Sequence, residues 1–282
     1  MIISIASGKG GTGKTTVATS LALSIERAVQ FLDCDVEEPN AHIFIKPDIE
    51  STQAVFIPVP EIDESKYDYC GRCQEVCVYN AIAVIPPAEK PVRAGKTLIF
   101  PELCHGCGAC SYFCPKGAIK EVNRQIGVVE KGKKEGLEFV HGRLNIGEPM
   151  APPLVRAVRR HVDRAKTVII DAPPGTSCPV ITSIKDTDYC ILVTEPTPFG
   201  LYDLILAVEV LKKLKIPFGV IINRAGLGND ETDKYCRKEN IPVLMKIPFS
   251  REIAAAYSRG TAVVEAFPEY RERFMKVFKD IK

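Results

Sequence analysis

A glycine-rich segment near the N-terminus combines the residue types that bind phosphate. It fits the pattern G-x-x-x-x-G-K-[ST] and consists of Gly8, Lys9, Gly10, Gly11, Thr12, Gly13, Lys14, Thr15 and Thr16. Glycines let backbone N–H groups line a cradle for phosphate oxygens. Lys14 is expected to reach the β- and γ-phosphates of a nucleotide, Thr15 to bind Mg²⁺ and Thr16 to contact the α-phosphate. A plain glycine turn is the alternative.

Cysteines form the second group of residues suited to chemistry. Seven of the eleven lie between Cys70 and Cys114, where apolar runs are short. The N-terminus has no charged segment with a cleavage site, so clustered cysteines indicate metal ligands better than disulfides. Thiolates suit iron–sulfur clusters or zinc. Because this stretch cannot build a large core, we expect metal to hold it together.

The second cysteine run is complete. It has the spacing C-x-x-C-x-x-C-x-x-x-C-P, made by Cys104, Cys107, Cys110, Cys114 and Pro115. This run resembles the one that binds [4Fe–4S] clusters in bacterial ferredoxins. Zinc is the alternative, although zinc sites do not normally use four cysteines in a run that ends in proline.

The first cysteine run is incomplete. Cys70, Cys73 and Cys77 match its last three positions, while Tyr67 stands in the first. Similar tails, Asn80–Ile82 and Gly117–Ile119, follow both runs and support an internal repeat.

The resemblance to two-cluster ferredoxins implies the ligand sets, because there the fourth cysteine of each run binds the other cluster. One [4Fe–4S] cluster would then have a full set: Cys77, Cys104, Cys107 and Cys110. The other would have three thiolates, from Cys70, Cys73 and Cys114. This second site is expected to hold a [3Fe–4S] cluster or a [4Fe–4S] cluster with one labile iron. A phenolate ligand from Tyr67 is the alternative.

Strands and helices alternate on both sides of the cysteine block. Ile2 to Ala6 is a predicted buried strand, Thr15 to Arg27 a helix and Val29 to Leu32 the next strand. Strands are also expected at residues 167–170, 190–194, 217–223 and 243–247, and helices at 201–214, 231–239, 251–259 and 270–281. This alternation predicts an α/β fold with a mostly parallel sheet and helices on both faces.

Lys9 makes the phosphate loop similar to the deviant Walker A motif of the MinD/ParA family of P-loop ATPases. The resemblance covers nearly all of residues 1–58 and 131–282. It implies an ATP-dependent homodimer in which Lys9 contacts the nucleotide of the partner subunit and is catalytic together with Lys14. A solvated surface lysine is the alternative.

Three further segments match this family. Asp35 follows the second strand and would bind the Mg²⁺ shell and position or activate the attacking water. Asp171 and Gly175 resemble the Walker B and switch II residues, which implies that Asp171 holds Mg²⁺ through water and that the Gly175 N–H senses the γ-phosphate. Asn223 and Arg224 resemble the adenine-recognising segment.

The resemblance places a P-loop ATPase domain at residues 1–58 and 131–282, and an inserted α+β ferredoxin-like domain at residues 59–130. A net charge of +2 does not suggest a nucleic-acid partner. Apolar runs too short to span a membrane and the absence of a leader predict a cytoplasmic protein. The amphipathic C-terminal stretch from Tyr270 is expected to pack on its own domain, with membrane binding as the alternative.

The predicted function is slow ATP hydrolysis that couples ATP-dependent dimerisation to electron transfer or to delivery of a metal cluster. The cofactors would be ATP or ADP with Mg²⁺ and two clusters. The partner would be a redox protein or a cluster acceptor, including an anaerobic enzyme that receives metal. The alternative is a MinD-like spatial-positioning or scaffold ATPase whose clusters are structural.

Overall fold

The computed structural model describes residues 1–26, 28–87 and 95–282, and it divides into two compact units. The first unit comprises Met1–Gln53, Val129–Arg143 and Leu154–Lys282, and the second comprises Ala54–Val128 and Leu144–Pro153. Two long strands, β3 (Asp48–Ile62) and β6 (Ile119–Lys134), carry the chain between the units.

Within the described residues, nine strands form one sheet in the order β11-β10-β9-β1-β8-β2-β7-β6-β3. The remaining strands are β1 (Ile2–Ala6), β2 (Val29–Asp33), β7 (Leu137–Leu144), β8 (Thr167–Asp171), β9 (Tyr189–Thr194), β10 (Phe218–Ala225) and β11 (Val243–Pro248). All pairs from β11 through β1 to β7 are parallel. The predicted α/β fold with a mostly parallel sheet is therefore confirmed.

Side chains that alternate along the central strands build two hydrophobic cores. Ile191 and Val193 of β9 join one core, whereas Cys190 and Leu192 join the other. Successive side chains of a strand point to opposite faces, so both faces of this sheet are buried. The run Tyr189–Thr194 is apolar almost throughout because helices cover it on each side.

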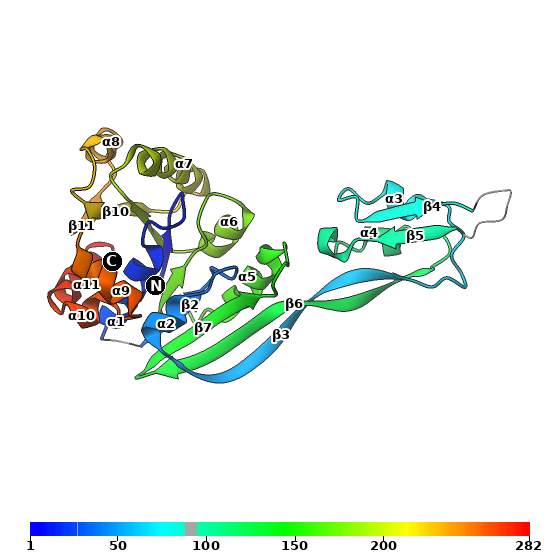
Figure 1. The fold of residues 1–282 in the computed structure, drawn as a ribbon, viewed down its shortest axis with the longest axis horizontal. Coiled ribbons are helices and arrows are strands. Elements are labelled where there is room, and N and C mark those ends of the chain that lie inside the picture. Colours follow the sequence, from blue (N-terminus) through cyan, green and yellow to red (C-terminus); the bar gives the residue numbers. More distant parts are fainter. Residues whose placement is uncertain (27, 88–94) are drawn as a thin grey trace. The chain divides into compact units, whose positions relative to one another are not determined.

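Helices pack on both faces of this sheet (Figure 1). One core includes residues of α1 (Lys14–Ser24), α2 (Ala41–Ile45), α10 (Val263–Ala266) and α11 (Glu269–Asp280). The other includes residues of α6 (Cys178–Ile184), α7 (Pro198–Leu214) and α8 (Glu231–Lys238). The first unit also contains α9 (Arg251–Ser258) and most of α5 (Ala151–Arg159).

The C-terminal helix packs on its own unit. Phe274, Val277 and Phe278 of α11 are buried in the core that α1 also joins. Its apolar face, which the sequence offered as a membrane contact, is thus occupied by protein. None of the described helices is long and apolar enough to cross a membrane.

The second unit is small and has short elements. It contains α3 (Arg72–Glu75), β4 (Ile82–Ile85), β5 (Lys96–Ile99), a 3₁₀ turn (Pro101–Leu103) and α4 (Ala109–Tyr112). β4 and β5 form an antiparallel pair. Its buried cluster consists of Tyr67, Cys73, Ile82, Ala118 and Ile119. So small a core gives limited hydrophobic stabilisation, as expected for a unit that needs a further cross-link.

Candidate functional site

The glycine loop connects β1 to α1. Gly11 and Gly13 have φ angles of 77° and 93°, which L-residues with side chains rarely adopt. Gly13 is the N-cap residue of α1, so the free N–H groups of the first turn point out of the helix end next to the loop. A helix N-terminus after a glycine loop attracts phosphate through these N–H groups and the helix dipole.

A cavity of about 340 Å³ adjoins this loop. That volume lies in the range of small-molecule sites. Predicted residues on its wall are Gly10, Gly11, Gly13, Lys14, Thr15, Thr16, Asp35, Asn223 and Arg224. Five predicted residues do not line it: Gly8, Lys9, Thr12, Asp171 and Gly175.

Three aspartates meet beside the loop because their strands are neighbours. Asp171 ends β8 and lies in register with Ile5 of β1 and with Asp33 of β2. Asp35 follows β2 two residues later. The carboxyl ends of parallel strands share one edge of the sheet, so these carboxylates lie together. The charge of the buried Lys14 acts on Asp35 and Asp171, and Thr15 lies beside Asp171.

The aspartates differ in their partners. Asp33 is buried and accepts hydrogen bonds from the Asp35 and Ala41 N–H groups at 3.0 and 3.1 Å, so it fixes the turn after β2. Asp171 is also buried, yet neither of its carboxylate oxygens has a hydrogen-bond partner within the usual limits in the described chain. Burial raises the pKa of Asp171 to about 6, although the charge of Lys14 and the nearby Thr15 hydroxyl act to lower the pKa.

An unpartnered buried carboxylate beside a threonine hydroxyl fits Mg²⁺, which prefers oxygen ligands and keeps several waters. Asp35, half-buried on the cavity wall, has its pKa raised to about 7 by burial, with Lys14 opposing and Asp171 adding to the rise. A cation would relieve the repulsion among these carboxylates. The donor set therefore fits a nucleotide-bound Mg²⁺ held by Thr15, Asp35 and Asp171.

Replacing Asp171 with asparagine tests this interpretation with two opposite effects. The folded pKa of about 6 lies above the ordinary pKa of 3.8, so the charged form opposes folding once the pH exceeds the pKa of the carboxyl in the unfolded chain. We expect the nucleotide-free D171N protein to be more stable at pH 7, by about 1–3 kcal/mol, because one pKa unit is about 1.4 kcal/mol. Mg²⁺·ADP should stabilise the wild type and not the variant. Thermal unfolding with and without Mg²⁺·ADP measures both; a destabilised variant that still responds to Mg²⁺·ADP contradicts the assignment.

The opposite wall comes from the ends of β10 and β11. Asn223 Nδ2 donates to the Thr12 carbonyl at 2.8 Å, which ties this wall to the phosphate loop. Pro248, Phe249 and Tyr257 also line the cavity. Aromatic and proline faces beside an amide are suited to an adenine base.

Several wall residues were not predicted from the sequence: Glu38, Asn40, Ser250, Ile253, Ala254 and Tyr257. Of these residues, Ser250 could have been predicted from its position before a helix. It caps α9 by accepting hydrogen bonds from the Glu252 and Ile253 N–H groups at 3.1 and 3.2 Å. A strand followed by a capped helix puts the cap at the sheet edge where the other ligand-binding loops lie. Tyr257 carries no such signal.

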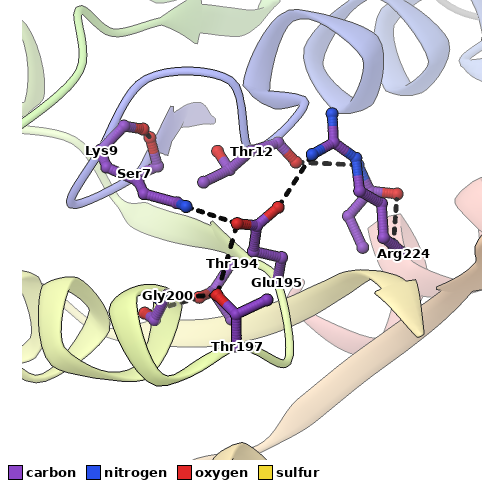
Figure 2. Close-up of polar contacts among 9 residues, drawn as sticks. Ser7, Lys9, Thr12, Thr194, Glu195, Thr197, Gly200 and Arg224 are labelled. Atoms are coloured by element: carbon purple, nitrogen blue, oxygen red, sulfur yellow. Dashed lines mark hydrogen bonds and ion pairs between the residues drawn. The ribbon is translucent and has the colours of Figure 1, made fainter. Parts of the chain in front are cut away.

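Lys9 and Gly175 make contacts outside the cavity wall. Lys9 forms an ion pair with Glu195, shown in Figure 2. The Gly175 N–H donates to the Ser7 carbonyl at 2.9 Å. To sense the γ-phosphate, the Gly175 N–H would have to break this hydrogen bond. The roles of Gly175 and Lys9 stay predictions.

The second unit contains a smaller cavity on whose wall four cysteines meet: Cys77, Cys104, Cys107 and Cys110. These are the four residues of the predicted complete ligand set. Two backbone N–H groups donate hydrogen bonds to thiols of this cavity. The Ala81 N–H donates to Cys77 Sγ at 3.3 Å, and the Gly106 N–H donates to Cys104 Sγ at 3.4 Å. Such bonds stabilise thiolates and tune iron–sulfur clusters. Burial raises the pKa of Cys110 to about 11, so this thiol stays protonated at neutral pH unless a cation binds it.

The two cysteine runs share a local geometry. Gly71 and Gly108, with φ angles of 80° and 73°, precede the short helices α3 and α4. The Ala81 and Ala118 N–H groups donate to Cys77 and Cys114 Sγ, each at 3.3 Å. The structure thus repeats the backbone around both runs, although the incomplete run lacks one cysteine.

The three-cysteine set is less uniform. Cys73 is buried, Cys114 is partly buried and Cys70 is exposed. The Tyr67 hydroxyl lies 2.9 Å from Cys73 Sγ, so tyrosine fills the position of the missing cysteine. Burial, with the hydrogen bond to Cys73, raises the pKa of Tyr67, which disfavours a phenolate at this position.

Across residues 1–26, 28–87 and 95–282, no group of three or more histidine, cysteine or acidic side chains forms a site for a metal ion. The choice between zinc and iron–sulfur clusters, and the number and type of clusters, stay predictions.

Known proteins support the nucleotide site. Residues 3–263 match the model of the CbiA family, described as the CobQ/CobB/MinD/ParA nucleotide binding domain. An uncharacterized protein of Methanocaldococcus jannaschii, MJ0579, is 31% identical over 279 residues, covering 96% of this chain and 93% of that protein. An iron–sulfur cluster carrier protein of Pyrococcus horikoshii is 23% identical, covering 99% of this chain and 87% of that protein.

Solved structures show the same fold. MinD of Pyrococcus horikoshii, complexed with Mg-ADP, superposes with a TM-score of 0.59 at 19% identity and covers 100% of this chain and 96% of its own. The cell division ATPase MinD of Pyrococcus furiosus gives 0.57 at 20% identity, covering 99% and 97%. With the loop, the aspartates and the family match in agreement, the chain belongs to the CbiA family of CobQ/CobB/MinD/ParA nucleotide-binding domains, which have the P-loop NTPase fold.

Proposed function

We propose that this chain is an ATPase that carries iron–sulfur clusters in residues 59–130 and couples ATP-dependent dimerisation to electron transfer or to cluster delivery. One observation carries the proposal: in a chain of a nucleotide-binding family, Cys77, Cys104, Cys107 and Cys110 line a single cavity. Relatives named iron–sulfur cluster carrier proteins cover nearly the whole chain and support it.

The nucleotide would bind along the cavity from Lys14 to Asn223. Lys14 and the α1 N–H groups hold the β- and γ-phosphates, and Asn223 and Arg224 contact the base. Asp35 orients the attacking water and, once deprotonated, accepts its proton. When bound, Mg²⁺ supplies charge neutralisation on the phosphate oxygens. Lys9 acts on the nucleotide of a second copy of the chain.

The four cavity thiolates would bind one [4Fe–4S] cluster, and Cys70, Cys73 and Cys114 a second cluster with an open position. Such clusters supply one-electron transfer or transferable iron and sulfide. The chain's own contribution is the N–H donors at Ala81, Gly106 and Ala118. These donors stabilise negative sulfur and fix the loops that carry the cysteines.

A matched pair of exposed cysteines tests the ligand assignment. Cys107 lines the cavity and Cys178 follows β8 in the first unit, and both are exposed. After anaerobic reconstitution, we expect C107S to lose roughly half of the bound iron, because one of two clusters loses a thiolate. C178S should keep the wild-type iron content. Equal iron in both variants contradicts the assignment.

Coupling between the two functions needs its own experiment. Rates of cluster reduction by a chemical reductant and of cluster transfer to an apo-ferredoxin are measured anaerobically, with Mg²⁺·ATP and without nucleotide. We expect ATP to change at least one rate severalfold in the wild type and neither rate in K14A. Clusters that respond to no nucleotide, in a chain that hydrolyses ATP, would instead favour the spatial-positioning or scaffold ATPase with structural clusters.

A further inference from the structure

Glu195 is a buried acid that holds two cations of the nucleotide site at once. It follows β9 and is one-tenth exposed in its side chain. One oxygen, Oε1, pairs with Lys9 Nζ, and the other, Oε2, accepts from Arg224 at 2.9 Å. Figure 2 shows the carboxylate between the two side chains. Glu195 therefore bridges the phosphate loop and the wall assigned to the base.

Electrostatics favour the charged form of this acid. Burial alone raises the pKa of a carboxyl, but the hydrogen bonds and charges of Lys9 and Arg224 lower the pKa of Glu195 overall. Thr197 adds a weak hydrogen bond to Oε1 at 3.4 Å and also caps α7 by accepting from the Gly200 N–H. Glu195 is thus ionised and held on a rigid turn.

The backbone around Lys9 is fixed independently of its side chain. Ser7 Oγ donates to the Lys9 carbonyl at 2.6 Å. A Cβ atom at Gly8 would lie 2.1 Å from the Asp203 carbonyl oxygen, so the loop packs directly on α7. With the main chain held in this way, Glu195 decides where the partly exposed ammonium group of Lys9 lies. Held there, Lys9 does not line the nucleotide cavity, whereas Lys14 does.

We propose that Glu195 is a positioning residue that retains Lys9 in the single chain and releases it when a second copy docks over the nucleotide. This inference rests on the proposed function, in which Lys9 acts across the dimer. Docking must break the Lys9–Glu195 pair, so the pair opposes dimerisation. Arg224 remains as the counterion of Glu195 after release, which avoids leaving a buried carboxylate without a partner.

The test is the variant E195Q, in which the amide keeps the shape and a hydrogen bond but loses the charge. Two quantities are measured on the full chain after anaerobic reconstitution. The first is the rate at which an amine-reactive reagent labels Lys9 in the nucleotide-free protein, read by mass spectrometry. The second is the dimer dissociation constant with Mg²⁺ and a non-hydrolysable ATP analogue, from analytical ultracentrifugation.

We expect E195Q to raise the Lys9 labelling rate severalfold and to tighten the dimer by about 5–50-fold, the usual range for coupling between two sites. E209Q is the matched control, because Glu209 is an exposed acid on α7 and its substitution changes the net charge equally. It should alter neither quantity. K9A should abolish the dimer in both the wild-type and the E195Q backgrounds.

The outcomes separate the two proposals. If the wild type and E195Q both stay monomeric at saturating analogue, the proposed dimer is contradicted, whereas dimerisation of E195Q alone supports the inference. The inference is overturned if Lys9 labelling is unchanged in E195Q, or if E195Q dimerises no more tightly than the wild type. Weaker nucleotide binding by E195Q together with a weaker dimer also overturns it, since Glu195 would then only support the fold of the site.

Discussion

Replacing Asp35 with asparagine is expected to lower the rate of ATP hydrolysis by about 10²–10⁴-fold, the usual contribution of a general base. Asp35 lines the nucleotide cavity beside Lys14, and asparagine keeps its size. Because the amide cannot accept the proton of the attacking water, the chemical step slows. Lys14, the loop N–H groups and Asn223 are unchanged, and Thr15 and Asp171 remain to hold Mg²⁺, so ATP affinity should fall far less than the hydrolysis rate. Phosphate release and nucleotide binding measure the two effects.

The pH dependence gives a second signature of the same residue. The pKa of Asp35 is raised to about 7, with burial as the largest cause. The deprotonated form is the active one, so kcat/KM for ATP should rise with pH and level off above about 7, because kcat/KM reports the free enzyme. The residual activity of D35N should lack this rise.

Two further variants define the controls for D35N. E37Q removes an exposed acid two residues away and should keep hydrolysis within about threefold of wild type, as expected for a surface change. K14A should lose both hydrolysis and nucleotide affinity, because Lys14 is buried on the cavity wall. Full activity in D35N, or an equal loss in E37Q, would assign the water-positioning role to another group.

The first part of the fold was predictable because short-range patterns determine it. The strand Ile2–Ala6 and the helix after it follow from an apolar run, a glycine loop and the helical spacing of Val17, Leu21 and Ile25. The structure begins α1 at Lys14 and ends it at Ser24, whereas the sequence predicted a helix to Arg27, which lies outside the described residues. The β-branched end of that helix, at Ile25, adopts an extended conformation with ψ of 119°.

The long strands β3 and β6 were not predicted. Their sequences mix charged and apolar residues, and most of the side chains in β3 are exposed or only partly buried. Exposed strands lack the continuous apolar run that identifies a buried parallel strand. Only pairing between segments about 70 residues apart makes them strands, and such pairing leaves no local signal.

The side chains that contact the site residues could likewise not be predicted from the sequence. Asp35, Asp171, Asn223 and the cysteines could be named because each stands in a motif. Glu195 follows an apolar strand without any motif, and it became relevant only when the fold placed it beside Lys9. Similarly, His141 had no predictable partner, but its Nε2 atom lies 2.8 Å from Glu130 across neighbouring strands. Motifs identify the groups that touch a ligand, whereas tertiary packing decides what holds those groups.

Restoring the missing cysteine is expected to change the type of the second cluster. Tyr67 occupies the first position of the incomplete run, and its hydroxyl lies 2.9 Å from Cys73 Sγ. In Y67C, a fourth thiolate joins Cys70, Cys73 and Cys114. We expect the iron content to rise from about seven to about eight atoms per chain, as a three-iron cluster becomes a four-iron cluster. The EPR signal of an oxidised three-iron cluster should disappear.

Two control variants separate the thiolate from the loss of the tyrosine ring. Y67A also removes the ring that packs edge-on against Tyr69, but it adds no ligand, so it should not gain iron. Y67F keeps the ring and removes only the hydroxyl near Cys73.

Y67F should retain the wild-type cluster type but lower its reduction potential, because hydrogen bonds to cluster sulfur favour the reduced, more negative state. Two four-iron signatures in the wild type would show that the second cluster has a fourth ligand other than the thiolates of Cys70, Cys73 and Cys114. In that case Y67F tests whether the Tyr67 oxygen is that ligand. If it is, removing the hydroxyl should release iron from the second cluster instead of shifting the reduction potential of that cluster.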